Sequence, residues 1–200
     1  MKQTEPSFSG KDVQTEPPFS NKARLNTVGF SQNITGFPVS FYFNKIYSEA
    51  AKIAESNKSD VCLDFGCGSQ RLKPFIKKGK YVGYDVIEEF SDVKSYRDAK
   101  PSIFLALNVL EHLEKQELEE VCSWLCEVKP QKIVVSLPAD SSLSRFSIWF
   151  LGRGFKHEVD HVLSWQQVVK VLREHFDLVG YKRVFFMQWV SLWKLKGNEK

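Results

Sequence analysis

The chain has 200 residues, enough for one domain with a well-buried core, and 42% of them are hydrophobic, 26% charged and 14% aromatic. Its formal net charge of +4 is small and its basic residues are scattered, so the composition does not indicate a nucleic-acid-binding protein. No apolar run reaches the ~20 residues of a membrane-spanning helix, and the polar N-terminus has no signal-peptide core, so we expect a cytoplasmic location.

Residues 1–36 are predicted to form a disordered tail. They contain a tandem near-repeat, in which QTEPSFSGKDV is followed in the same register by QTEPPFSNKAR. Two short copies rich in Pro, Ser and Thr cannot bury a core of their own. A docking motif is the functional alternative for this segment. The ordered domain is expected over residues 37–200.

Helical and strand patterns alternate along this domain. Helices are predicted over 38–56, 69–78, 110–128 and 164–176, with Pro74 interrupting or opening the second and Ser164 capping the last. Apolar runs predict strands over 61–65, 80–86, 103–109 and 132–138, and a closing pair over 177–186 and 188–196. We therefore expect an α/β fold: a Rossmann-like three-layer sandwich around a mostly parallel sheet of seven strands, or a reduced number, with a C-terminal antiparallel strand.

The stretch VCLDFGCGSQ, residues 61–70, indicates a ligand site. In open α/β sheets, ligands bind beyond the carboxyl ends of the strands, usually beside the first strand. Gly66 and Gly68 permit a tight turn, and Asp85 at the end of the next strand suits a carboxylate that accepts two ribose hydroxyls. A dinucleotide-binding turn needs a further glycine where Arg71 stands, so the pattern favours a different adenosine-type ligand over NAD or FAD.

Three motifs in this order resemble the class I S-adenosylmethionine-dependent methyltransferases: VCLDFGCGS, YVGYDV and LALNVLEHL. The similarity is strongest to a small group with the sequence LEH at this place, and it covers about residues 60–180. The first motif of that family is D-x-G-x-G-x-G, so Gln70 departs from it at the last glycine. Gln131 and Lys132 likewise replace two glycines that precede the fifth strand of the family.

The resemblance implies S-adenosylmethionine as cofactor and assigns roles to matching residues. Asp64 supports the turn and the amino-acid end of the cofactor, and Asp85 binds the ribose hydroxyls. The remaining residues line the methionine, ribose and adenine or lie near the methyl group: Gly66, Cys67, Gly68, Val86, Leu107 and Asn108. Between Asp85 and the next strand the chain is short, so a shortened strand is expected in SDVKSYRDA (91–99), where Asp98 is either an adenine ligand or a plain loop carboxylate.

Histidines are candidates for a general base, which is needed only if the acceptor must lose a proton. His112 follows the strand at the cofactor edge and is either catalytic or bonded to a neighbour at the start of a helix. His161 precedes a helix on the catalytic side, where similar methyltransferases carry a histidine. A metal site is the alternative for the KHEVDH segment (156–161) and for Cys122 with Cys126, although no metal is expected because buried cysteines are commonly small hydrophobic residues.

The segment from 141 to about 160 is the expected acceptor-recognition insert. Its apolar side chains within 141–155 predict either a packed lid helix or an apolar surface for a lipid-like or aromatic acceptor, or for peripheral membrane contact. The sequence thus predicts a methyltransferase for a small-molecule, glycan or lipid-linked acceptor. The alternative is a catalytically inactive protein of the same fold that serves as a binding or partner module, and a nicotinamide-dependent oxidoreductase is a weaker rival.

Overall fold

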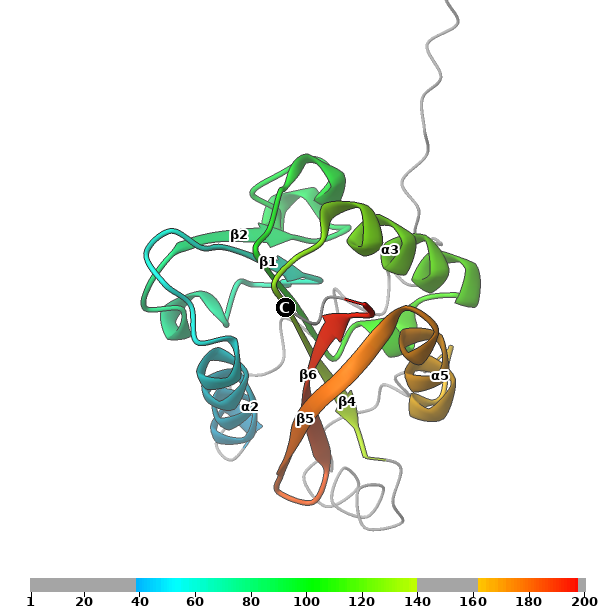
Figure 1. Ribbon diagram of the computed structural model, residues 1–200. Coiled ribbons are helices and arrows are strands. Elements are labelled where there is room, and N and C mark those ends of the chain that lie inside the picture. The colour runs from blue at the N-terminus through cyan, green and yellow to red at the C-terminus, as the bar shows by residue number, and fades with distance from the viewer. Residues whose placement is uncertain (1–38, 140–161, 198–200) are drawn as a thin grey trace, which may run out of the picture.

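The computed structural model describes residues 39–139 and 162–197 (Figure 1). The predicted tail of residues 1–36 and the apolar insert of residues 141–160 lie outside this part of the chain. None of the described helices combines the length and apolar character needed to cross a membrane.

A six-stranded sheet forms the centre of the domain, in the order β2-β1-β3-β4-β6-β5. The first four strands in the chain run parallel, whereas β6 is antiparallel to both β4 and β5. The predicted α/β sandwich with a reduced sheet and a C-terminal antiparallel strand is therefore confirmed. The strands are β1 (Val61–Phe65), β2 (Lys80–Tyr84), β3 (Ile103–Leu107), β4 (Lys132–Pro138), β5 (Phe176–Val184) and β6 (Gln188–Leu195).

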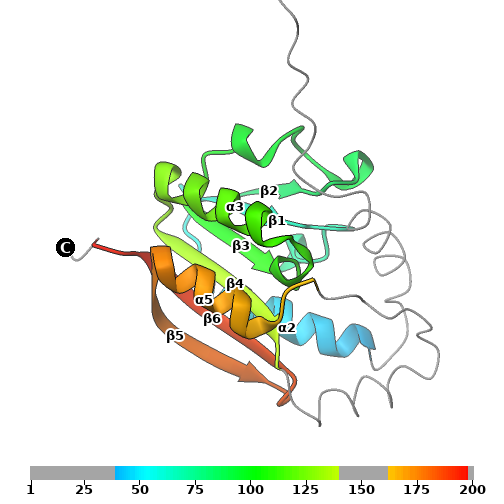
Figure 2. The ribbon, with the colours of Figure 1, turned by 90° about the vertical axis from the view of Figure 1, so that its right-hand side faces the viewer.

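Helices cover both faces of the sheet. Helix α2 (Val39–Ala54) lies on one face, and α3 (Lys115–Val128) and α5 (Trp165–His175) lie on the other (Figures 1 and 2). Each face has its own apolar core, and all five residues of β3 are buried between them. This double burial explains why the parallel strands are apolar at successive positions instead of alternating.

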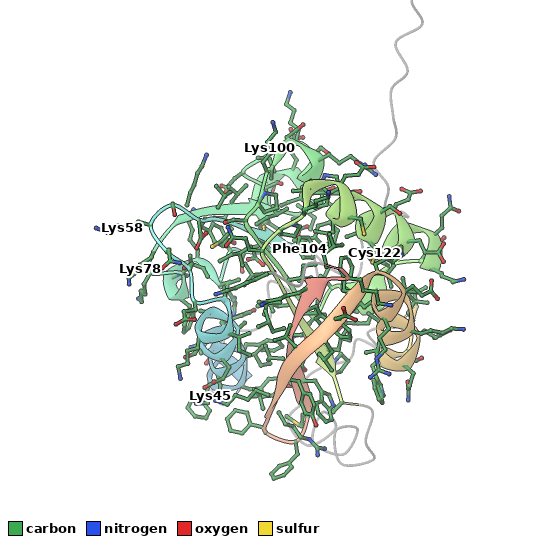
Figure 3. The ribbon with its side chains drawn as sticks, viewed as in Figure 1. Lys45, Lys58, Lys78, Lys100, Phe104 and Cys122 are labelled. Carbon is green, nitrogen blue, oxygen red and sulfur yellow. The ribbon has the colours of Figure 1, made fainter. Side chains whose placement is uncertain are left out.

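The core beneath α3 contains the cysteine that was considered as half of a metal site. Cys122 is fully buried among apolar residues, and Phe104 of β3 lies in the same core (Figure 3). By contrast, Lys58, Lys78 and Lys100 project from the periphery of the molecule. The structure therefore places Cys122 as a small hydrophobic residue, and burial raises the pKa of its thiol to about 12.

The prediction of a shortened strand within residues 91–99 is wrong. The chain between β2 and β3 instead forms two 3-10 helices, η2 (Glu88–Phe90) and η3 (Tyr96–Asp98). Asp98 is exposed and completes the capping box of η3 by accepting the Ser95 amide. The edge of β2 is closed by one residue of the loop: the Asp92 amide donates to the Gly83 carbonyl, and the Asp92 carboxylate accepts the Gly83 amide, both over 2.8 Å. A single aspartate thus satisfies both backbone groups of Gly83 that a further strand would pair.

Two helix predictions also need correction. The segment 69–78 contains only a 3-10 turn, η1 (Lys73–Phe75), with Pro74 in its first turn. The helix predicted over 110–128 is divided into η4 (Leu110–His112) and α3, because Glu114 forms a capping box with Glu117 and starts a new helix. The predicted cap of α5 is confirmed, since the Ser164 hydroxyl accepts the amide of Gln167.

Candidate cofactor and acceptor site

The glycine turn after β1 closes onto the carboxyl end of β2. The amides of Gly66 and Cys67 both donate to the carbonyl oxygen of Tyr84, over 2.7 and 3.0 Å. Gly66, Gly68 and Gln70 all have left-handed backbone conformations, with φ of +73°, +47° and +56°. Glycine adopts this conformation without steric cost, which explains the first two positions of the motif physically. The turn lies between β1 and its neighbours β2 and β3, where the strand order reverses.

The carboxylate of Asp85 joins this turn to the end of β2. One carboxylate oxygen accepts the amide of Gly68 over 2.8 Å, and the other accepts the amide of Ile87 over 3.0 Å. Burial raises the pKa of Asp85, and these backbone donors oppose the rise. Each oxygen of a carboxylate has capacity for a further hydrogen bond, so the group is oriented by the protein and can still accept two ligand hydroxyls.

Gln70 occupies the place of the last glycine and performs a bonding role that glycine cannot. Its side-chain amide nitrogen donates to the carbonyl oxygen of Phe90 over 2.9 Å and to the carboxylate of Asp92 over 3.1 Å. Its amide oxygen accepts the ammonium group of Lys73 over 2.8 Å. The side chain therefore ties the glycine turn to the loop that closes the edge of β2, and these bonds offset the strain of its left-handed backbone.

Asp64 is buried beneath the turn at the end of β1. Its carboxylate accepts the hydroxyl of Tyr81 over 2.6 Å. Burial raises the pKa of Asp64 to about 7; the bond from Tyr81 acts in the opposite direction, and the negative charge of Asp85 raises the pKa further. A positive charge beside this carboxylate would favour its ionised form and so lower its pKa.

Cys67 serves packing within the turn. Its thiol donates to the carbonyl oxygen of Phe90 over 3.3 Å, and a β-carbon added to Gly83 would lie 2.9 Å from its sulfur. Burial raises the pKa of this thiol strongly, and the nearby carboxylates of Asp64, Asp85 and Asp92 raise it further. A thiol in such surroundings stays protonated at neutral pH, which argues against a nucleophilic role for Cys67.

A second polar group lies at the same edge of the sheet, where β3 and β4 end and β6 begins. The Asn108 side-chain oxygen accepts hydrogen bonds from the Ser136 hydroxyl, over 3.3 Å, and from the Gln188 side-chain amide. Gln188 also donates to Ser136 over 2.6 Å and accepts the hydroxyl of Tyr42 over 3.0 Å. This group, which we call the Asn108 network, joins α2, β4 and β6 to the residue that follows β3.

The Asn108 network adjoins the glycine turn. Asn108 itself has a left-handed φ of +57°, and its neighbour Val109 packs against Gly66 so closely that a β-carbon there would be 2.4 Å from Cγ2 of the valine. The turn and the network therefore form one continuous edge of the sheet. Leu107 is buried in the core on the α2 face, and Val86 packs against the core on the opposite face.

Glu111, in η4, is a buried acid that the sequence motifs did not single out. Its side chain is 1% exposed, and its Oε2 atom has no hydrogen-bond partner among residues 39–139 and 162–197. Burial raises its pKa to about 8. Its backbone carbonyl accepts the amides of Val162 and Leu163, both over 3.0 Å, which attaches the chain entering α5 to η4.

Of the two candidate histidines, His112 belongs to the described part of the chain. His112 is half-buried in η4, and its amide donates to the Val109 carbonyl over 3.0 Å. His161 and the KHEVDH segment lie outside the described residues. Within the described residues no group of three or more His, Cys, Asp or Glu side chains is arranged to hold a metal ion. The remaining half of the cysteine pair, Cys126, has its sulfur 3.7 Å from Nδ1 of His175.

No protein-family model matches the sequence, and no curated protein is similar to it in sequence. Solved structures are similar to it in fold. The structure of the complex that contains the Trm112 methyltransferase activator from Haloferax volcanii gives a TM-score of 0.63 at 11% identity, covering 86% of this chain and 97% of the other. The PH0226 protein from Pyrococcus horikoshii gives 0.62 at 15% identity, covering 82% and 94%.

The N-methyltransferase NodS from Bradyrhizobium japonicum, solved with S-adenosyl-L-homocysteine, gives a TM-score of 0.60 at 9% identity, covering 86% of this chain and 98% of the other. Identities this low establish the fold alone. The chain therefore has the fold of class I S-adenosylmethionine-dependent methyltransferases.

Sequence reasoning missed most of the Asn108 network and all of the environment of Glu111. Tyr42 and Gln188 are separated by 146 residues, and no local pattern connects them. Ser136 did carry a signal, since it is a polar residue inside the apolar run IVVSL and is fully buried. A buried hydroxyl needs a partner, so its presence predicts a polar neighbour on an adjacent strand without identifying it.

Proposed function

We propose that the protein is an S-adenosylmethionine-dependent methyltransferase that binds its cofactor at the glycine turn and transfers the methyl group to a small-molecule, glycan or lipid-linked acceptor. The observation that carries this proposal is the carboxylate of Asp85, oriented by the amides of Gly68 and Ile87 at the carboxyl end of β2. The fold, the left-handed turn and this carboxylate agree with an adenosine ligand at the reversal of strand order.

The residues at this edge fit the different parts of the cofactor. Asp85 would accept the ribose hydroxyls, with Val86 beside the adenine. The buried carboxylate of Asp64 would support the cationic amino-acid end, and Gly66, Cys67 and Gly68 would line the methionine and ribose. Leu107 and Asn108 would lie near the methyl group. Val109 fills the space that a side chain on Gly66 would need, so residue 66 carries none. The cofactor would therefore pass along a turn with a bare backbone at this position.

When bound, the cofactor supplies a sulfonium group that makes its methyl carbon electrophilic. The work of the protein is to hold the acceptor in line with that carbon and to exclude water, and well-oriented reactants gain up to roughly 7–11 kcal/mol from such alignment. His112 and His161 are our proposed candidates for removing an acceptor proton. If the acceptor is lipid-linked, we also propose that residues 141–155 contact the membrane surface. Retention of the protein in solution when it is mixed with anionic vesicles would contradict this contact.

Calorimetric titration of S-adenosylmethionine and S-adenosylhomocysteine into the full chain tests the proposal. Wild-type protein is expected to bind both, and Asp85→Asn is expected to weaken binding about 10- to 100-fold, because hydrogen bonds to a charged group contribute about 1.5–3 kcal/mol. Asp177→Asn is the matched control, since Asp177 is exposed on β5 and should leave the affinity unchanged.

The outcome also distinguishes the enzyme from a catalytically inactive binding module of the same fold. Failure of well-folded wild-type protein to bind either ligand contradicts the proposal. Binding followed by methyl transfer to an acceptor in a screen with radiolabelled donor supports the enzyme, whereas binding without transfer across small-molecule, glycan and lipid acceptors favours the binding module.

A further inference from the structure

Three buried side-chain atoms within the described residues have no hydrogen-bond partner: Tyr96 Oη, Glu111 Oε2 and Trp165 Nε1. Glu111 is the ionisable carboxylic acid among them. Leaving a buried polar atom without a partner destabilises a protein by about 1–3 kcal/mol, and more if the group is charged. An unpaired carboxyl atom at the edge of a ligand site therefore calls for a physical explanation.

No charge on the described residues compensates Glu111. Burial raises its pKa, and only its own backbone amide acts against that rise. On the opposite face of the sheet, Tyr42 of α2 interacts electrostatically with Glu111. The pKa of Tyr42 is raised mainly by burial and to a smaller extent by the negative charge of Glu111. A neutral tyrosine hydroxyl that already donates to Gln188 supplies no positive charge. A buried carboxylate is stable when a cation pairs with it.

Glu111 is close in the chain to residues of the proposed cofactor site. It is two residues after Val109, which packs against Gly66, and three after Asn108, the residue proposed to lie near the methyl group. Glu111 is near enough to Tyr42, a member of the Asn108 network, for its negative charge to raise the pKa of that tyrosine. Helix α5 packs against η4, the element that carries Glu111. A ligand group that reached Oε2 would be enclosed by protein on several sides.

We propose that Glu111 binds the protonated amine of a nitrogen acceptor at its unpaired carboxylate oxygen and takes the proton that the amine must lose before methyl transfer. This inference rests on the proposed function and specifies its acceptor class. It adds to the two candidate histidines a residue whose burial and missing partner are both observed.

The step balances in atoms and charge. An ammonium group gives one proton to the Glu111 carboxylate, which leaves a neutral amine and a neutral carboxylic acid. The nitrogen lone pair then forms a bond to the methyl carbon while the carbon–sulfur bond breaks, and its electron pair stays on sulfur. The product is a protonated N-methyl amine, and Glu111 returns its proton to solvent. A base with a pKa close to the working pH is well suited to this exchange.

The test uses methylammonium, the smallest primary amine, as the probe. The full chain is labelled with ¹³C at the side-chain carboxyl of glutamate and titrated with acid and base in the presence of S-adenosylhomocysteine, which carries no sulfonium charge. Glu111→Gln identifies the Glu111 resonance by its loss, and Glu174→Gln, which removes an exposed glutamate of α5, is the matched control. Each titration is run in 0.2 M methylammonium chloride, in 0.2 M KCl, and in 0.2 M KCl with 0.2 M methanol.

We expect methylammonium to lower the midpoint of the Glu111 titration by about one pH unit relative to KCl, which corresponds to a dissociation constant of about 20 mM for the ionised site. An unchanged midpoint overturns the proposal. A raised midpoint in methanol together with no effect of methylammonium also overturns it and points to a hydroxyl acceptor. Because calorimetry of S-adenosylhomocysteine is performed on the same samples, a failure of cofactor binding is recognised separately from a failure of the amine site.

Discussion

The α-carbon of Gly66 packs directly against the side chain of Val109, and this contact joins the glycine turn to the end of β3. A β-carbon on Gly66 would lie 2.4 Å from Cγ2 of Val109, far inside any real contact distance, and the backbone there is left-handed with φ of +73°. Two independent constraints, one of conformation and one of space, therefore require glycine at this position.

Gly66→Ala is expected to lower the free energy of unfolding by about 2–5 kcal/mol, since the left-handed conformation contributes about 1–2 kcal/mol and crowding about 1–3 kcal/mol. Urea denaturation measures the change. Gly180→Ala is the control, because no atom lies within 4 Å of a β-carbon there. Adding Val109→Ala should relieve only part of the crowding, because the remaining β-carbon of residue 109 would still lie 2.8 Å from the added one. In a double-mutant cycle that includes Val109→Ala alone, a coupling energy of zero would argue against the clash.

Gln70 allows a comparison between backbone strain and side-chain bonding. Gln70→Ala loses the bonds to Phe90 and Asp92 and keeps the left-handed φ of +56°, whereas Gln70→Gly loses the same bonds and relieves the strain. Gln70→Gly should therefore be more stable than Gln70→Ala by about 1–2 kcal/mol in chemical denaturation. Equal stability of the two variants would mean that the turn relaxes out of this conformation.

Glu49 is a buried carboxylate of α2 that binds three lysines. Its two oxygens contact Lys182 of β5 over 2.6 Å and Lys45 and Lys52 over 3.1 Å each, and it is 2% exposed. The bond from Lys182 is the largest influence on Glu49 and lowers its pKa from 4.5 to about 2, with burial acting in the opposite direction.

Glu49→Gln should lower the free energy of unfolding at pH 7 by about 1.5–3 kcal/mol. Since the folded-state pKa is depressed, the stabilisation is present above about pH 4.5 and is lost as the pH falls toward 2. The denaturation midpoints of wild type and variant are therefore expected to converge on acidification. The control is Glu119→Gln, because the Glu119 pair with Lys115 is exposed and should contribute about 0–1 kcal/mol.

The contribution of Asp64 to stability is expected to depend on pH in the opposite sense to that of Glu49. Folding raises its pKa from 3.8 to about 7, so its favourable contribution is complete below about pH 3.8 and is lost as the pH rises through 7. Asp64→Asn should flatten the fall in thermal midpoint between pH 5 and 8. Part of the slope should persist, because the pKa of Glu111 is raised to about 8. Identical midpoint profiles for variant and wild type would contradict the raised pKa.

The sheet and most helices could be predicted because their determinants are local. The apolar runs of β1 and β4 were predicted with the bounds that the structure has, and the α5 cap at Ser164 follows from its hydroxyl and the nearby Gln167. The prediction of a strand within residues 91–99 was wrong because the polar composition of this segment permits several turn conformations. The conformation of this segment is fixed by Asp92, which forms hydrogen bonds with both backbone groups of Gly83, nine residues earlier on β2.

The same distinction holds for the candidate site. The glycine turn and the acids Asp64 and Asp85 were recognisable in the sequence. Steric limits on the backbone and the position at the end of a strand restrict which residue types occur at neighbouring positions. The Asn108 network was not recognisable, since it unites residues from α2, β4 and β6 with the end of β3. The sequence likewise does not reveal that Glu111 Oε2 has no hydrogen-bond partner in the part of the chain that the structure describes. Local conformation depends on neighbours in the chain, whereas pairing and burial depend on how distant segments pack, and packing has no counterpart in local pattern.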